Sequence, residues 1–173
     1  MRKSAHQTNP LNRGFKERTI VATLEEYLPS DKPIIKNQSI KGGSRRRPDI
    51  LIDCYDYVII IEIDERQHKS YTDSQQRTND IIHDLQDKFL VMIRFNPDSY
   101  RSKGKSYRSL FSKTKVDRIY KIGCTKKYAE RTNVLKQVLS YYLEHKPHKS
   151  FIQHDLYFNG YQFTDIIELT SNA

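Results

Sequence analysis

Residues 57–64, with the sequence YVIIIEID, constrain the fold more than any other stretch of the chain. Five of these eight residues are Val or Ile, whose branched side chains favour extended backbone, and they follow one another without polar alternation. Strands that are apolar on both sides are typical of the centre of a sheet that is covered on both faces. The stretch therefore predicts a central strand in an α/β protein.

The remaining patterns predict the elements around this strand. Apolar residues at helical spacing predict helices over residues 15–28, 72–88 and 125–143. Short β-rich runs predict strands over residues 33–40, 48–53 and 89–95. Asn159-Gly160 separates two further runs, 151–158 and 161–167, and is typical of a type I′ turn in a β-hairpin.

The length of 173 residues suits a single domain with its own core. We expect this domain to span residues 14–173, after a flexible polar tail of residues 1–13. The fold class expected is α/β with a mixed central sheet, a C-terminal helix and a β-hairpin. No apolar run of 18 residues and no secretory signal are visible, so an intracellular protein is expected. Two widely spaced cysteines predict neither a zinc site nor a disulfide.

Three acids of the central region are expected to converge. If the strands 48–53 and 57–64 form a hairpin with Tyr55 and Asp56 at its turn, Asp49 lies opposite Glu62. Asp64 then shares the face of Glu62, because alternate residues of a strand point to the same side. Such like charges near an apolar sheet need compensation, which a hard cation such as Mg²⁺ or Mn²⁺ supplies most simply. The alternative is that these acids only cap the exposed strand ends.

All the net positive charge of the chain lies in one segment, residues 101–127. This segment holds ten Lys and Arg residues against a single acid, Asp117, with tyrosine and phenylalanine interleaved. Basic and aromatic side chains together suit phosphate neutralisation and stacking on exposed bases, so DNA or RNA is the expected partner. A solvated basic loop is the alternative. The candidate nucleic-acid ligands here are Lys103, Lys105, Arg108, Lys113 and Lys115.

The motif formed by Pro48-Asp49 and Glu62-Ile63-Asp64 resembles that of the PD-(D/E)XK, or restriction-endonuclease-like, nuclease superfamily. The residues 62–68, EIDERQH, are similar to the branch that includes the very-short-patch repair endonucleases. The residues 94–98, RFNPD, resemble proteins of this type from large DNA viruses. The resemblance covers residues 15–100 and implies a restriction-endonuclease-like sheet flanked by helices. It also implies an intracellular site of action in the nucleus, the cytoplasm or a viral factory.

The resemblance implies roles for individual residues. Asp49 and Glu62 match the metal ligands of the superfamily, and Glu17 matches an acid that many members carry on the first helix. Asp64 stands where most members have a lysine, so it is expected to be a further ligand, with His68 as general base or leaving-group acid. Lys69 is an alternative source of the missing positive charge.

Further polar residues flank these positions. Arg45, Arg46 and Arg47 are expected to contact the phosphate backbone, and the adjacent Gly42-Gly43 allows a partner to approach closely. Gln67, Arg77 and Asp80 are candidates for the same cleft. A solvated salt-bridge face is the favoured interpretation of the helix residues Asp73, Arg77, Asp80 and Asp84.

These features together predict a Mg²⁺-dependent DNA endonuclease that uses a metal-activated water. The alternatives are an inactive nucleic-acid-binding module of nuclease fold, an RNA-processing nuclease, or an interaction protein that binds an acidic partner. One small domain with one site needs a second copy to cut both strands together, so a homodimer is a further expectation.

Overall fold

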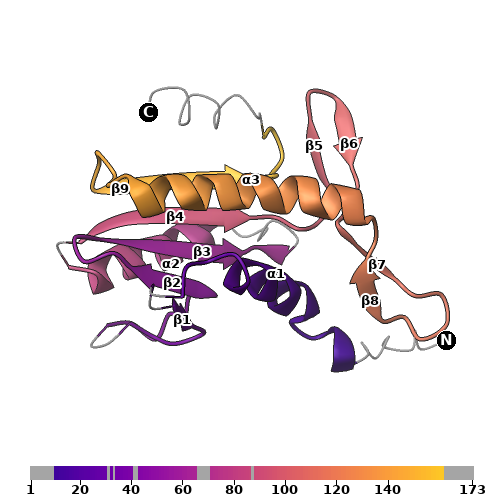
Figure 1. The fold of residues 1–173 in the computed structure, drawn as a ribbon, viewed down its shortest axis with the longest axis horizontal. Helices are drawn as coiled ribbons and strands as arrows, with labels where there is room; N and C mark the ends of the chain where they lie inside the picture. The colour runs from indigo at the N-terminus through magenta and orange to yellow at the C-terminus, as the bar shows by residue number, and fades with distance from the viewer. Residues whose placement is uncertain are drawn as a thin grey trace.

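A five-stranded mixed sheet forms the centre of the fold in the computed structural model (Figure 1). Its strands, in spatial order, are β1 (Ile34–Lys36), β2 (Ile50–Asp53), β3 (Tyr57–Ile63), β4 (Phe89–Phe95) and β9 (Phe151–Leu156). β1, β2 and β3 pair antiparallel, whereas β3, β4 and β9 pair parallel. The structure describes residues 10–30, 32, 34–40, 43–65, 71–86 and 88–161.

The hairpin of β2 and β3 has the register that the sequence predicts. Ile50 pairs with Ile61 and Asp53 with Val58, with the turn at Tyr55 and Asp56. Tyr55 takes a positive φ of 68°, and its backbone N–H donates to Asp53 Oδ1 over 3.0 Å. The same register carried one pair further places Asp49 opposite Glu62.

Helices cover both faces of the sheet (Figure 1). α1 (Phe15–Glu25) and α3 (Thr125–Glu144) share one apolar cluster with Ile59 and Ile61 of β3. α2 (Tyr71–Asp84) packs through Ile81 against the opposite side of the same strand. All seven residues of β3 are buried, which explains why its apolar run does not alternate. Each fully buried isoleucine contributes about 1.5–3 kcal/mol.

Two small hairpins extend from the sheet end at which β3, β4 and β9 terminate (Figure 1). The first is β5 (Tyr100–Ser102) with β6 (Lys105–Tyr107), and the second is β7 (Phe111–Lys113) with β8 (Tyr120–Ile122). Lys103 and Gly104 turn the first hairpin with positive φ values of 47° and 73°, as in a type I′ turn. The basic segment is therefore built into two β-ribbons.

Arg131 of α3 anchors the first hairpin. Its side chain is buried and donates to the backbone carbonyls of Asp98 over 3.2 Å and Arg108 over 2.8 Å. Its guanidinium also lies over the rings of Tyr100 and Tyr157, 4.9 and 5.0 Å from their centroids. The chain is thus fixed to α3 on both sides of β5 and β6.

The sequence predictions differ from the structure at three boundaries. Pro10–Asn12 form a 3₁₀ helix, and Asn12 exchanges hydrogen bonds with Arg118 and Tyr120, so residues 10–13 belong to the folded domain and not to a tail. β1 is shorter than the predicted strand. At Asn159-Gly160 only Gly160 has a positive φ, which excludes a type I′ turn, and the expected partner strand lies almost entirely outside the described residues. Among the described helices, none is both long and apolar enough to cross a membrane.

We predict that Arg131→Met lowers the free energy of unfolding by about 2–4 kcal/mol, because two partly buried hydrogen bonds to backbone carbonyl groups are lost together with the contacts of the guanidinium to two tyrosine rings. Urea denaturation measures the change. Lys136→Met on the same helix is the matched control, since Lys136 lies over the Tyr27 ring and is partly exposed. Equal losses in the two variants would contradict the anchoring role of Arg131.

Candidate functional site

A row of charged residues crosses the sheet at the ends of β3, β4 and β9. On the face toward α2, β3 carries the buried Val58 and Ile60 and then Glu62. Glu62 is in register with Arg94 of β4, and Arg94 is in register with Asp155 of β9. Partners in register on parallel strands project to the same face, so the apolar surface gives way to a charged one along all three strands.

Glu62 is paired with an arginine of α2. Its side chain is buried, and both carboxylate oxygens accept from Arg77 Nη2, at 2.8 and 3.0 Å. The same nitrogen donates to the backbone carbonyl of Arg47 over 2.9 Å. Arg77, whose side chain is 31% exposed, therefore neutralises Glu62 and also fixes the chain that leads into β2.

Asp64 is paired with Arg94. Its Oδ2 atom lies 2.5 Å from Arg94 Nε, and both side chains are largely buried. Arg94 also approaches Asp155, at 3.8 Å between Nη1 and Oδ1, and lies 5.1 Å from the ring centroid of Phe158. Arg94 of β4 thus bridges Asp64, which follows β3, and Asp155 of β9, the two strands on either side of β4.

Asp49 is held by the backbone of β3. Its Oδ2 atom accepts from the N–H of Ile63 over 2.6 Å, which fixes the carboxylate beside Glu62. The pKa of Asp49 is raised to about 6, mainly by burial and in smaller part by the negative charges of Glu17 and Asp64, while the hydrogen bond from Ile63 opposes the rise. Glu17, on the first turn of α1, accepts from Asn37 Nδ2 over 3.0 Å. The structure therefore brings Asp49, Glu62, Asp64 and Glu17 to one region.

The pKa of Glu62 is raised to about 7, mainly by burial, while the charges of Asp49 and Asp64 add to the effect and Arg77 opposes it. The site holds five carboxyl groups, those of Glu17, Asp49, Glu62, Asp64 and Asp155, against the guanidinium groups of Arg77 and Arg94, so its acids outnumber its bases. Two carboxyl groups with pKa values near neutrality mark a place where a further positive charge would be stabilised.

The donor chemistry fits a hard divalent cation, because every side-chain acceptor in the row is a carboxylate oxygen. Within the described parts of the chain, however, no three Asp, Glu, His or Cys side chains are gathered as a group that could hold a metal ion. Arginines compensate Glu62 and Asp64 in this arrangement. Asp49, Glu62 and Asp64 are the residues that would ligate such an ion, with Arg77 displaced from Glu62.

The loop before β2 docks on α2. Ser44 donates from its backbone N–H and its hydroxyl to Asp84, both over 2.6 Å, and Arg46 Nε donates to Asp80 over 2.9 Å. A Cβ atom on Gly43 would meet Asp84 at 2.3 Å, so the partner that approaches this glycine closely is α2 itself. The prediction of a solvated salt-bridge face was therefore wrong for Arg77, Asp80 and Asp84.

The predicted phosphate-binding arginines differ in their surroundings. Arg45 and Arg47 are exposed, whereas Arg46 is half-buried and paired with Asp80. His68 and Lys69, together with Gln67, lie outside the described residues.

All ten basic residues of the segment 101–127 are exposed. They lie along the two hairpins, in the segment between these hairpins and at the start of α3. The five candidates Lys103, Lys105, Arg108, Lys113 and Lys115 belong to this exposed set.

Sequence reasoning missed Arg94 and Asp155 as parts of the site. Arg94 interrupts an otherwise apolar strand, which is a signal that could have singled it out. Asp155 carries no comparable signal, because its register with β4 joins residues 61 positions apart. Comparison with protein-family models and with curated protein sequences finds no match to this chain.

We predict that the free energy of unfolding falls as pH rises from about 4 to about 7. The folded state holds protons on Asp49 and Glu62 more tightly than the unfolded chain does. The stabilisation from these protonated groups is therefore present at low pH and is lost as the groups ionise. Asp49→Asn and Glu62→Gln should each flatten the slope, with an effect on the order of 2 kcal/mol. Urea denaturation across this range is the measurement.

The control is Asp56→Asn, at the exposed turn of β2 and β3, where the side chain is 70% exposed. This substitution should leave the slope as it is in the wild type. Parallel curves for the wild type and the two site variants would show that burial does not shift these carboxyl groups.

Proposed function

We propose that this chain is a Mg²⁺-dependent endonuclease that hydrolyses phosphodiester bonds in DNA and has a restriction-endonuclease-like fold. The observation that carries the proposal is the register of β2 with β3, which brings Asp49 and Glu62 together at the sheet end from which the two basic hairpins extend. The order of helix, three antiparallel strands, helix and parallel strand supports the fold assignment.

The two hairpins grip the phosphate backbone in this proposal. Their lysines and arginines are exposed, and the hairpins extend from the sheet end that carries the acidic row. DNA held by the hairpins would therefore have its backbone near that end of the sheet. A protein that only binds nucleic acid gains nothing from buried acids at that place, because carboxylates repel phosphates.

Asp49, Glu62 and Asp64 would hold the ion, and Glu17 of α1 adds a further negative charge near Asp49. When bound there, Mg²⁺ offsets phosphate charge and lowers the pKa of a coordinated water. Arg77 is partly exposed, so its guanidinium would be able to bind a phosphate oxygen if Glu62 were a ligand of the ion. Arg94 holds Asp64 and supplies positive charge next to the position where the superfamily pattern has lysine. His68 is assigned the proton transfer.

A non-catalytic nucleic-acid-binding module of the same fold is the second candidate. The pairing of Glu62 with Arg77 and of Asp64 with Arg94 favours it, because two of the three acids are already neutralised without a metal ion. An RNA-processing nuclease would use the same residues as the DNA endonuclease.

We predict that the purified protein cleaves DNA with Mg²⁺ or Mn²⁺ and not with EDTA. Asp49→Asn and Glu62→Gln should each lower the cleavage rate by about 100-fold or more, the scale on which the loss of one charge-stabilising group acts. Plasmid, branched, mismatched and single-stranded DNA, and RNA, should be tested in parallel by gel electrophoresis.

Asp53→Asn serves as the matched control, because Asp53 pairs with Lys88 at the opposite end of β2. Cleavage that survives both EDTA and Asp49→Asn would refute the metal mechanism. Binding without cleavage of any substrate would favour the non-catalytic module.

The basic hairpins generate a separate prediction about salt. Replacement of Lys105, Lys113 and Lys115 by Gln should reduce the slope of log binding constant against log salt by about 1 for each phosphate group that is no longer neutralised. Fluorescence anisotropy with labelled DNA measures this slope. Lys88, Lys146 and Lys149, near the other end of the sheet, form a control set of the same size. Equal slopes for the wild type and the hairpin variant would mean that these hairpin lysines do not contact the DNA.

A further inference from the structure

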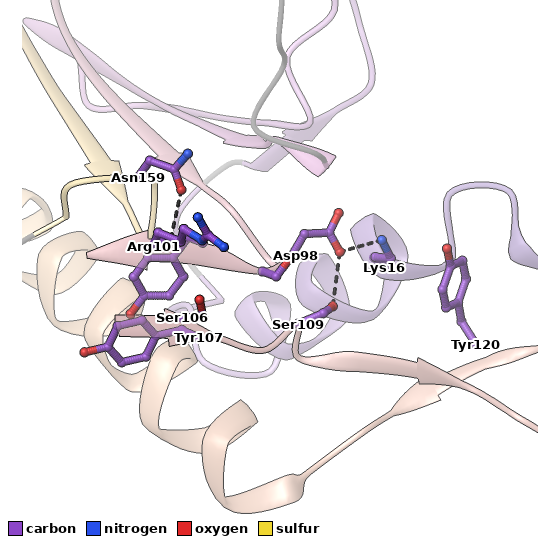
Figure 2. A pocket seen from close by; sticks show the side chains of 10 residues that line it. Lys16, Asp98, Arg101, Ser106, Tyr107, Ser109, Tyr120 and Asn159 are labelled. Carbon is purple, nitrogen blue, oxygen red and sulfur yellow. Dashed lines mark hydrogen bonds and ion pairs between the residues drawn. The ribbon is translucent and has the colours of Figure 1, made fainter. Parts of the chain in front are cut away.

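A cavity of about 690 Å³ lies between the two hairpins (Figure 2). β5 and β6 form one side, Tyr120 of β8 the other, and Lys16 of α1 and Asp98 lie at its base. The volume falls in the range typical of sites for small organic ligands, about 300–1,000 Å³. It lies outside the acidic row described above, since none of its lining residues belongs to that row.

The base of the cavity is polar and balanced in charge. Lys16 is only 4% exposed, and its Nζ atom lies 2.7 Å from Asp98 Oδ1. Ser109 Oγ donates to the same oxygen over 3.1 Å (Figure 2). An ammonium, a carboxylate and a hydroxyl group are thus held together at the base, and groups of these kinds recognise the hydrogen-bonding edges of bases.

One wall of the cavity is a pair of stacked tyrosines. The rings of Tyr100 and Tyr107 have centroids 4.5 Å apart and planes within 7° of each other. Tyr100 is buried, whereas Tyr107 is 40% exposed and lines the cavity. Stacking on Tyr100 fixes the plane of Tyr107, so the exposed ring is a rigid, flat surface. Such a surface suits a planar ligand.

Two exposed cations lie at or near the cavity. Arg101 lines the cavity and is exposed, and its backbone is fixed by the bond from its N–H to Asn159 Oδ1 over 2.8 Å (Figure 2). Lys113 is not a lining residue, but its Nζ atom lies 4.9 Å from the ring centroid of Tyr120, which lines the cavity. A ligand with a planar ring and an attached phosphate matches this combination of flat wall, polar base and cationic rim.

The cavity is joined directly to the end of β3. Lys16 Nζ lies 3.3 Å from Glu65 Oε2 as well as 2.7 Å from Asp98. Glu65 follows Asp64 of the acidic row, so a ligand in the cavity would lie next to the strand end that carries the proposed catalytic acids.

We propose that this cavity is a subsite for one unstacked nucleotide, whose base lies against Tyr107 and whose phosphate meets Arg101. The inference rests on the proposed function in taking nucleic acid as the ligand, and it names the substrate class. The preferred substrate carries an unpaired nucleotide, as at a bulge, a gap or a single-stranded end, because such a base is extruded at least cost.

Binding in EDTA tests the subsite without requiring cleavage. Three labelled probes are compared by fluorescence anisotropy: a continuous duplex, the same duplex with one unpaired adenosine nucleotide, and the same bulged duplex with an abasic residue at that position. We expect the probe with the unpaired base to bind about tenfold more tightly than the other two, as base stacking on an aromatic side chain provides.

Two variants that change the cavity in opposite ways show whether a lost preference comes from the cavity and not from a folding defect. Tyr107→Ala removes the flat wall and Ser106→Trp fills the cavity, and both should abolish the preference for the unpaired base. Tyr55→Ala is the matched control, because Tyr55 is 91% exposed at the turn of β2 and β3. It should keep the preference.

Equal affinity for the base-bearing and abasic bulges overturns the subsite, even if the protein cleaves DNA with Mg²⁺. A preference that survives both Tyr107→Ala and Ser106→Trp also overturns it. A preference that both variants abolish supports the subsite, and it does so even if no substrate is cleaved, in which case only the endonuclease proposal fails.

Discussion

The pairing of β2 with β3 is the constraint on which the rest of the structure depends. Side chains alternate between the faces of a strand, so a shift by one residue would exchange the two buried faces of β3 and turn Glu62 into the core beneath α1 and α3. The apolar packing on both faces therefore fixes the register. That register in turn fixes the position of Asp49 beside Glu62. The packing of the core thus holds two acids together against their mutual repulsion.

Charge compensation follows from that forced proximity. The acids need positive partners because burial disfavours their ionised forms, and the structure supplies Arg77 from α2 and Arg94 from β4. The two arginines differ in exposure. Arg94 lies on the sheet with its side chain 13% exposed, whereas Arg77 is 31% exposed on a helix surface. In the proposed endonuclease, Arg77 would therefore be displaced from its acid more readily than Arg94.

The sequence predicted the features that depend on residues close together in the chain. The β2–β3 register followed from a two-residue turn, and the three helices and the central strand followed from periodicity and branching. Contacts between distant segments were not predictable in this way. Arg94 meets Asp155 only because β9 returns parallel to β4 after α3, and Gly43 meets Asp84 across a loop and a helix. The sequence could not show that Arg46 and Arg77 form ion pairs between the loop before β2, β3 and α2. The polar spacing on the helix is the same whether that face meets water or another segment of the chain.

Lys16 links the acidic row and the cavity in one further way. It is one buried cation shared by Glu65, after β3, and by Asp98, after β4. The loop after β3 and the loop after β4 therefore share a single buried positive charge. If a ligand in the cavity drew Asp98 away from Lys16, the ion pair of Lys16 with Glu65 would change with it, and linkage would make that influence equal in both directions. One side chain of α1 thus ties the base of the cavity to the segment that follows Asp64.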